Sequence, residues 1–264
     1  VVGSSITSGN YFAMDTWPPI LSEKGRVRPK QLLNTAKDYM SGFISQHYGY
    51  KGLNTCIYAS CATSLFSIDY AMRYVDDYDY VVCVISEHGV NEADISFNKQ
   101  LGAMGTKSCP FDDNRDGFIM GEGSGTFILE SEEKAKKRNA NIIAYLYTPG
   151  FSSDNSSFTS PDLDGAAAKL SMRNALKNND VSFVNAHGTS TPMGDEIEYN
   201  AIKEVVGNVP IVSNKSKIGH TMGACGIIEA IYTIKSLQSG QIPDNHNITK
   251  CSFDTDGMIT DKNR

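Results

Sequence analysis

The sequence lacks several features that would place it in a familiar class at once. It has no run of about eighteen apolar residues, which a membrane-spanning helix needs, and its N-terminus shows no signal-peptide pattern. Its 264 residues carry a net charge of −6, so the chain as a whole has no electrostatic attraction for nucleic acid or an anionic membrane. We therefore predict a soluble, cytoplasmic protein with no nucleic-acid or membrane partner.

Cysteine pairs and ligand clusters are also missing. The chain has six cysteines, but none forms a C-x-x-C pair, and they lie in apolar or small surroundings. This pattern fits free thiols in a reducing compartment better than a disulfide framework or a zinc site, and we predict no metal. The run from Gly121 to Gly125 reads Gly-x-Gly-x-Gly without a P-loop lysine, so it is too weak to indicate a nucleotide site.

Strand and helix patterns alternate along the chain. This alternation predicts an α/β fold with largely parallel sheets, and the length allows one large domain or two similar halves. We expect strands at 53–59, 80–85, 126–130, 142–147, 181–186 and 211–213. We expect helices at about 30–47, after residue 61, at 132–138, 166–176 and 196–206, and around Ile227, Ile231 and Ile234.

Cys61 is the candidate nucleophile. It lies in Ala-Ser-Cys-Ala-Thr-Ser, just before a helical pattern whose apolar face carries Leu65, Ile68, Met72 and Val75. Near the first turn of a helix, unpaired backbone N–H groups and the helix dipole favour a thiolate. For a single cysteine, the role of a small buried apolar residue is the commoner one, so the case for Cys61 depends on other motifs.

Two histidines follow predicted strands in glycine-rich turns. His187 stands in Asn-Ala-His-Gly-Thr-Ser-Thr-Pro-Met-Gly-Asp, at the strand end where parallel α/β sheets bind ligands. His220 stands in Lys-Ser-Lys-Ile-Gly-His, with Lys215 five residues earlier. Each histidine alone fits a structural role as well as a catalytic one. A cysteine and two histidines, each at such a turn, indicate a catalytic site.

Together these motifs resemble the β-ketoacyl-acyl carrier protein synthases, the elongating condensing enzymes of type II fatty acid and polyketide synthesis. The segment from Pro110 to Gly123, Pro-Phe-Asp-x-x-Arg-Asp-Gly-Phe-x-x-Gly-Glu-Gly, matches as well, and the resemblance covers almost the whole chain. It implies an acyltransferase of thiolase-like fold, with αβαβα layers and two similar halves packed together. The chain would be one ketosynthase domain with halves at about 1–130 and 140–264.

The reaction that the resemblance implies is a decarboxylative Claisen condensation. Cys61 would accept an acyl group as a thioester from an acyl carrier protein. His187 and His220 would donate N–H groups to the carbonyl oxygen of malonyl-acyl carrier protein and stabilise the enolate that forms as carbon dioxide leaves. The carbanion would attack the thioester and give a β-ketoacyl chain longer by two carbons. Two histidines favour the elongating enzymes over the initiating type.

The same resemblance implies supporting residues. Lys215 would orient the site electrostatically through Glu229 on the following helix, although a buried structural ion pair is a serious competing explanation. Thr189, Thr191 and Asp195 belong to the first histidine motif and are expected to support it. No cofactor is implied, because the phosphopantetheine of the carrier protein carries the substrates.

The chain departs from the family pattern in several places. A first strand-helix-strand portion would precede Val1, and a Gly-Phe-Gly-Gly-x-Asn turn, which supplies an oxyanion-hole N–H, would follow Arg264. We therefore expect an incomplete stretch of a longer ketosynthase. Smaller departures are Ser86-Glu87, where the family often has glycines, and Cys225, where it often has alanine. The alternative function is a catalytically idle, truncated relative acting as a partner or scaffold subunit; a thiolase-like enzyme fits the two histidines poorly.

An acyl carrier protein is the implied partner, and the chain would form a homodimer or a heterodimer with a ketosynthase-like subunit. Acyl carrier proteins are typically acidic, so an acidic enzyme needs a local basic patch for docking. Arg26, Arg28 and Lys30 form the densest basic cluster ahead of Cys61. A solvated loop explains this cluster about as well.

Overall fold

The computed structural model describes residues 2–4, 36, 38–147, 149–157, 160–177 and 179–260, which form two compact units. Unit 1 takes in the described residues up to Ile95, with Gly121–Ile143 and Thr221–Ile231. Unit 2 takes in Ser96–Met120, the described part of Ala144–His220, and the described residues from Tyr232 onward. Each unit thus gathers stretches that are far apart in the sequence. The division of one domain into halves near residues 130–140 stays a prediction.

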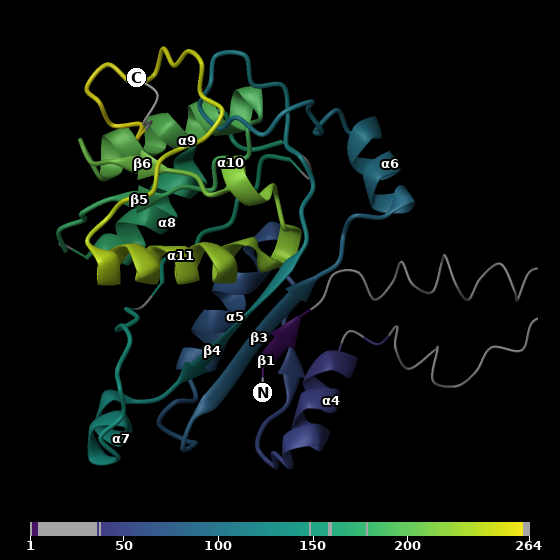
Figure 1. Cartoon of the computed structure of the whole chain (residues 1–264), viewed down its shortest axis with the longest axis vertical. Coiled ribbons are helices and arrows are strands. Elements are labelled where there is room, and N and C mark those ends of the chain that lie inside the picture. Colours follow the sequence, from purple (N-terminus) through teal and green to yellow (C-terminus); the bar gives the residue numbers. More distant parts are fainter. Residues whose placement is uncertain are drawn as a thin grey trace, which may run out of the picture. The chain divides into compact units, whose positions relative to one another are not determined.

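Unit 1 is built on a four-stranded sheet in the order β2-β1-β3-β4 (Figure 1). The strands are β1 (Val2–Ser4), β2 (Thr55–Cys56), β3 (Val81–Glu87) and β4 (Gly123–Leu129). β1 pairs in parallel with β2 and β3, whereas β4 runs antiparallel to β3 over its whole length. The parallel pairs confirm the predicted α/β class, and β4 adds an antiparallel edge.

The core of unit 1 forms around β3. The apolar run in this strand predicts burial on both faces, and the structure confirms it: Cys83 and Ile85 are almost fully buried on one face, and Val82 is buried on the other. Ile68 of α5 (Thr63–Met72) and Ile227 of α11 (Cys225–Ser239) complete the cluster. A Cβ atom on Gly125 of β4 would lie 2.8 Å from the Ile227 side chain. Glycine at that position therefore lets α11 pack against the sheet.

The remaining helices follow the predicted pattern in part. They are α4 (Tyr39–Tyr48), α6 (Glu92–Gln100), α7 (Glu132–Lys137), α8 (Ala166–Leu176), α9 (Pro192–Val205) and α10 (Lys215–Ile218), with 3₁₀ turns η2 (Ser60–Ala62) and η3 (Met222–Ala224). α7 and α8 match their predicted ranges closely. α9 begins earlier than predicted, with Pro192 in its first turn, a position that proline favours. α6 has no buried residue. A helix without a buried face carries no apolar periodicity in its sequence, so this helix could not have been predicted from such a pattern.

The prediction of a strand at 142–147 is wrong. Ile143, Tyr145 and Tyr147 alternate as a strand pattern requires, but these residues form no ladder in the structure and their side chains are exposed. A strand needs a hydrogen-bonding neighbour, and apolar alternation alone does not supply one. The two other strands predicted after residue 140, β5 (Val184–Asn185) and β6 (Ile211–Val212), are present but shorter than predicted.

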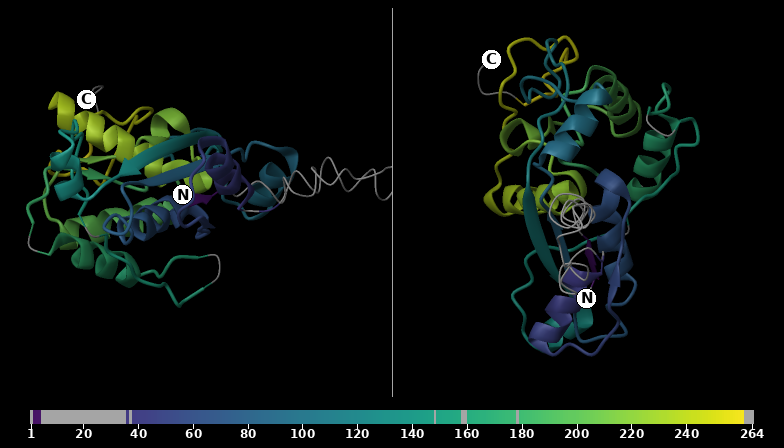
Figure 2. Two further views of the ribbon diagram at one scale, coloured as in Figure 1. Left: turned by 90° about the horizontal axis from the view of Figure 1, so that it is seen from below. Right: turned by 90° about the vertical axis from the view of Figure 1, so that its right-hand side faces the viewer.

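Unit 2 is built on β5 and β6, which pair in parallel. Its core contains Phe111 together with Ile202 of α9 and Ile211 of β6. α8 and α9 lie side by side (Figure 2), and Glu204 of α9 forms ion pairs with Lys169 at 2.5 Å and with an arginine of α8 at 2.7 Å. This frame sets β5 and β6 next to each other, so the turns that follow them begin close together.

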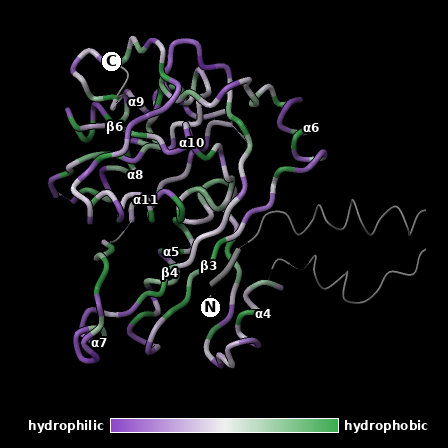
Figure 3. The backbone as a smooth tube through the Cα atoms, in the orientation of Figure 1, coloured by the Kyte–Doolittle hydropathy of each residue, from purple (hydrophilic) through white to green (hydrophobic). Residues whose placement is uncertain are grey.

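The surface of unit 1 includes one strongly charged helix, α7, which Figure 3 shows as a hydrophilic segment. Lys136 and Glu132 form an ion pair one turn apart, at 2.6 Å. Within the residues that the structure describes, no helix has both the length and the hydropathy needed to cross a bilayer.

Lys134 of α7 ties that helix to the turn after α5. Its Nζ donates hydrogen bonds to the carbonyl oxygens of Val75, Asp76 and Tyr78 at 2.9, 2.7 and 2.7 Å. We predict that Lys134→Met lowers the free energy of unfolding by about 1–3 kcal/mol, because three carbonyls lose a charged donor. Chemical denaturation measures this loss. Lys137→Met, at an exposed site on the same helix, is the control, and equal midpoints for the two variants would contradict the prediction.

Candidate active site

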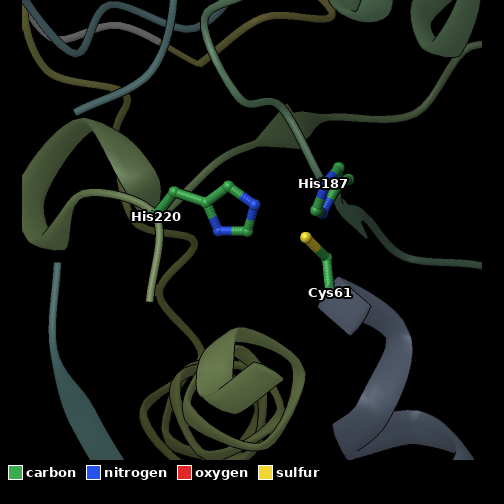
Figure 4. A group of neighbouring side chains, drawn as sticks. All are labelled: Cys61, His187 and His220. Atoms are coloured by element: carbon green, nitrogen blue, oxygen red, sulfur yellow. The ribbon is translucent and has the colours of Figure 1, made fainter. Parts of the chain in front are cut away.

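The two predicted histidines lie next to each other in unit 2. His187 comes two residues after β5, and His220 follows α10 and Gly219. Their ring centroids are 5.2 Å apart and the rings are nearly perpendicular, at 87° (Figure 4). The backbone N–H of His220 donates to the carbonyl of Ile119 at 2.7 Å, which fixes the start of its turn. Two imidazoles are thus held close enough to contact one small group.

Lys215, the first residue of α10, lies beside both rings. Its side chain is buried, and its Nζ donates to the carbonyl oxygen of His187 at 2.6 Å. The same Nζ lies 3.4 Å from Nδ1 of His187. An ammonium group offers only donors, so Nδ1 is the unprotonated nitrogen of a neutral ring and Nε2 carries the proton. His187 can therefore donate a hydrogen bond through Nε2.

Both imidazoles are held in the neutral form. The His220 side chain is 2% exposed; this burial, with the positive charge of Lys215, lowers the pKa of His220 to about 3. His187 is an exposed residue, yet protein atoms around its ring displace water, and this, with the charge of Lys215 and the neighbouring His220, holds the pKa of His187 well below its usual value. At neutral pH each ring can act as a neutral N–H donor.

Glu198 of α9 is a site residue that the sequence analysis missed. Its two carboxylate oxygens accept the backbone N–H groups of His187 and Gly188, each at 2.7 Å. Burial raises the pKa of Glu198, and these two N–H groups and the charge of Lys215 oppose that rise. The signal in the sequence is a glutamate three residues after Asp195, one turn further along the same helix.

Asp195 holds the turn after His187 to the segment that begins at Pro110. Its carboxylate is fully buried and accepts the backbone N–H groups of Phe111 at 2.8 Å and Ser190 at 3.0 Å. Burial raises the pKa of Asp195 to about 7, although these donors and Arg115, at 3.8 Å, act in the other direction. Asp195 therefore supports the histidine turn from within the protein.

The two predicted threonines lie in the same turn. The hydroxyl oxygens of Thr189 and Thr191 are 3.0 Å apart and hydrogen bonded to each other. Arg115 donates from Nε to the carbonyl of Thr191 at 3.2 Å and from its terminal nitrogen to that of Pro192 at 2.5 Å. These contacts set the path of the backbone between His187 and α9.

Cys61 lies in unit 1, in the 3₁₀ turn η2 directly ahead of α5. This confirms its predicted place near the first turn of a helix, and Figure 4 shows its side chain projecting from that turn. Ser60 has a φ of 48°, in the left-handed region, so the chain turns sharply just before the cysteine. Cys61 is partly exposed.

The predicted site residues divide between the two units. Unit 2 brings together His187, His220, Lys215, Asp195, Thr189 and Thr191, whereas Cys61 and Glu229 belong to unit 1. The pairing of Lys215 with Glu229 and the approach of Cys61 to the histidines stay predictions. Arg26, Arg28 and Lys30 lie outside the described residues, so the docking patch stays a prediction too.

Comparison with known protein families tests the family resemblance that the sequence motifs indicated. Residues 1–135 match the model of the β-ketoacyl synthase N-terminal domain, and residues 143–249 match the model of the β-ketoacyl synthase C-terminal domain. The chain belongs to the β-ketoacyl synthase family. Its Cys61, His187 and His220 motifs all fall inside the matched ranges, in agreement with the resemblance drawn from the sequence.

Named relatives of this β-ketoacyl synthase chain are 3-oxoacyl-[acyl-carrier-protein] synthases. The mitochondrial synthase of Arabidopsis thaliana is 38% identical over 241 residues, covering 83% of this chain and 51% of the relative. Synthase 2 of Vibrio cholerae is 34% identical over 268 residues, covering 94% and 64%. The chain thus spans about half to two thirds of the length of these relatives.

Solved ketosynthase structures share the fold. A ketosynthase of a type II polyketide system, in complex with its acyl-carrier protein, aligns with a TM-score of 0.87 and 26% identity, over 98% of this chain and 69% of that one. A β-ketoacyl synthase from Burkholderia phymatum aligns with a TM-score of 0.84 and 29% identity, over 94% and 64%. This β-ketoacyl synthase chain therefore has the predicted thiolase-like fold.

The charge of Lys215 should be visible in the titration of both histidines. We predict that Lys215→Met raises the pKa of His187 and of His220, because removal of a nearby positive charge favours the imidazolium. Ring chemical shifts measured by NMR against pH give both values. In the wild type, His220 should show no titration between about pH 5 and pH 8. Lys217→Met on the same helix is the control; identical ring pKa values in both variants and the wild type would contradict the assignment.

Asp112 fastens the Pro110 segment to the C-terminal loop of unit 2. Although burial opposes it, hydrogen bonds from the backbone N–H groups of Lys250, Thr249 and Asn114 lower the pKa of Asp112 to about 2. A carboxyl with a lowered pKa stabilises the fold above its unfolded pKa and loses that contribution as the pH falls through about 2.

We therefore predict that Asp112→Asn lowers the free energy of unfolding by about 2 kcal/mol at pH 7, with the difference shrinking as the pH falls below about 4. Denaturation midpoints measured across this range test the change. Asp164→Asn, at an exposed position in unit 2, is the control. A difference that stays constant down to about pH 2 would show that the charge of Asp112 is not the cause.

Proposed function

We propose that this chain carries the catalytic residues of a carrier-protein-dependent β-ketoacyl synthase that elongates acyl chains by decarboxylative condensation. The observation that carries the proposal is the His187–His220 pair, two neutral imidazoles 5.2 Å apart beside a buried lysine. Such a pair suits a developing oxyanion, because it offers two N–H donors without adding a full positive charge to the ground state.

The first step is acyl transfer to Cys61. The thiolate attacks the thioester of an acyl-acyl carrier protein, a new thioester forms on Cys61, and the carrier leaves with its phosphopantetheine thiol. The place of Cys61 at the start of α5 supports this role, because the backbone N–H groups and the dipole of a helix N-terminus favour a thiolate.

The second step is loss of carbon dioxide from a malonyl thioester. As the carbon–carbon bond breaks, its electrons move into the thioester carbonyl, and the oxygen becomes an enolate oxygen. Nε2–H of His187 and an N–H of His220 donate to that oxygen. The ammonium group of Lys215 contacts Nδ1 of His187, which sets the tautomer of the ring, and donates to the carbonyl oxygen of His187. The carboxylate of Glu198 accepts the backbone N–H of His187.

The third step forms the new carbon–carbon bond. The enolate carbon attacks the carbonyl carbon of the acyl group on Cys61, and the thiolate of Cys61 leaves. The products are a β-ketoacyl-acyl carrier protein, longer by two carbons, and a free enzyme thiol. The mechanism requires the thiol of unit 1 and the imidazoles of unit 2 to face one substrate.

The partner in this proposal is an acyl carrier protein, as in the type II polyketide ketosynthase that is similar in fold. The carrier brings its own phosphopantetheine, so the reaction needs no further cofactor or metal. We propose a dimer, either homomeric or with a ketosynthase-like subunit, because a ketosynthase paired with a chain length factor is among the structural neighbours. The cytoplasmic location stays a prediction, to be tested by cell fractionation.

A catalytically idle partner subunit is the alternative, and the residues of the chain oppose it. Such a subunit has no need of a cysteine at the helix start together with two histidines held neutral by a buried lysine. All four residues are present: Cys61, His187, His220 and Lys215. We therefore favour the catalytic function.

Release of carbon dioxide from malonyl-acyl carrier protein tests the proposal in the native full-length protein. We predict that His187→Ala and His220→Ala each slow the release about 100-fold to 1,000-fold, because each removes one donor to the enolate oxygen. Cys61→Ala should abolish condensation while leaving carbon dioxide release. His246→Ala, at a half-exposed position, is the matched control. Release at the wild-type rate from both active-site variants would overturn the proposal.

A further inference from the structure

A second cysteine lies against the candidate nucleophile within unit 1. The Sγ of Cys225, the first residue of α11, is 3.4 Å from the carbonyl oxygen of Cys61, to which its S–H donates. Cys225 is 1% exposed, whereas Cys61 is partly exposed. The two cysteines are far apart in the sequence, and the proposed condensation gives Cys225 no task.

The backbones around the two cysteines are in close contact. The hydroxyl of Ser64, three residues after Cys61, donates to the carbonyl of Gly223 at 2.5 Å. A Cβ atom on Gly226 would lie 2.9 Å from Cβ of Ser64, so no side chain fits between the two turns there. The seam formed by Cys61, Ser64, Gly223, Cys225 and Gly226 therefore brings the first turn of α5 against the start of α11.

This geometry places the sulfur of Cys225 beside the backbone of Cys61. The carbonyl oxygen and the Sγ of one cysteine are separated by only a few bonds, so rotation of the Cys61 side chain turns its sulfur toward a group that already contacts its carbonyl. A disulfide needs Cα atoms about 4.4–6.8 Å apart, so the proposal requires the two turns to meet this spacing.

We propose that Cys61 and Cys225 form a reversible intramolecular disulfide when a hydroperoxide oxidises the protein. In the first step the Cys61 thiolate attacks one peroxide oxygen, the oxygen–oxygen bond breaks, and a sulfenic acid and hydroxide form. In the second step the sulfur of Cys225 attacks the sulfur of Cys61. The oxygen leaves as water with the proton of Cys225, and a sulfur–sulfur bond replaces the sulfur–oxygen bond.

The environments of the other cysteines support this selectivity. Cys83 is fully buried in the core, and burial raises the pKa of its thiol to about 12. Burial also raises the pKa of the buried Cys109. A thiol reacts with peroxide as its thiolate, so these two react slowly. Cys61, partly exposed at the start of a helix, is the better first target, and Cys225 is the thiol in contact with its backbone.

The disulfide gives the site a reversible off state. Cys61 in a disulfide cannot accept an acyl group, a consequence that rests on the function proposed above. Without Cys225, the sulfenic acid on Cys61 can be oxidised further to a sulfinic acid, which thiols do not reduce. Cys225 thus protects Cys61 at the cost of temporary inactivity.

Peptide mapping of the native full-length protein tests this proposal. Reduced protein is treated with hydrogen peroxide, alkylated under denaturing conditions and digested without reductant. We expect a cross-linked peptide pair that contains Cys61 and Cys225, the loss of two of the six thiols of this chain, and full recovery with dithiothreitol. In Cys225→Ala, the same dose should leave no cross-link and place two oxygen atoms on Cys61.

The controls separate this proposal from a general sensitivity to oxidation. Cys251→Ala removes another partly exposed thiol and should leave the cross-link unchanged. The proposal is overturned if wild-type Cys61 becomes sulfinic acid as fast as in Cys225→Ala, or if it pairs with a different cysteine. The readout needs no carrier protein. Its failure therefore leaves the condensing function standing, and a failed condensation assay on reduced protein leaves the disulfide standing.

Discussion

A buried ammonium group is the interaction on which the histidine site depends. Lys215 lies almost fully out of solvent, with Nζ 2.6 Å from the carbonyl oxygen of His187 and 3.4 Å from its ring nitrogen. Its charge helps to keep His187 and His220 neutral, and its donors set which nitrogen of His187 carries the proton. A buried charge is costly unless other groups compensate it. Here the buried charge helps to keep two imidazoles neutral, so their N–H groups can donate hydrogen bonds to a developing negative charge.

Carboxylates hold the surrounding turns by binding backbone N–H groups. Glu198 accepts from the turn at His187, Asp195 accepts from that turn and from the segment at Phe111, and Asp112 ties the same segment to the C-terminal loop. Polar groups that would otherwise be unsatisfied in the interior thus find partners within unit 2. The site is positioned by loops that acidic side chains fasten, while the short strands β5 and β6 supply only its base.

The sequence predicted the features that depend on local residue patterns, but not the contacts between residues far apart in the chain. Continuous apolar runs identified β3, and spacing identified α8 and the place of Cys61, because burial and helix periodicity leave a direct trace in sequence. The strand expected at 142–147 failed because a strand depends on a partner that its own residues do not specify. Glu198 was missed for a similar reason. A single glutamate on a helix does not reveal which backbone N–H groups it will meet, and the contact between Cys225 and Cys61 spans 164 positions.

The most direct test of the account is the acylation of one thiol. Native protein is incubated with an acyl carrier protein that carries a medium-chain acyl group, and its intact mass is measured beside that of Cys61→Ala. The account predicts one acyl adduct, mapped to Cys61 and absent from the variant, and its discharge as a β-ketoacyl product when malonyl-acyl carrier protein is added. A protein that is folded and reduced but takes up no acyl group, or takes it up equally in Cys61→Ala, would contradict the account.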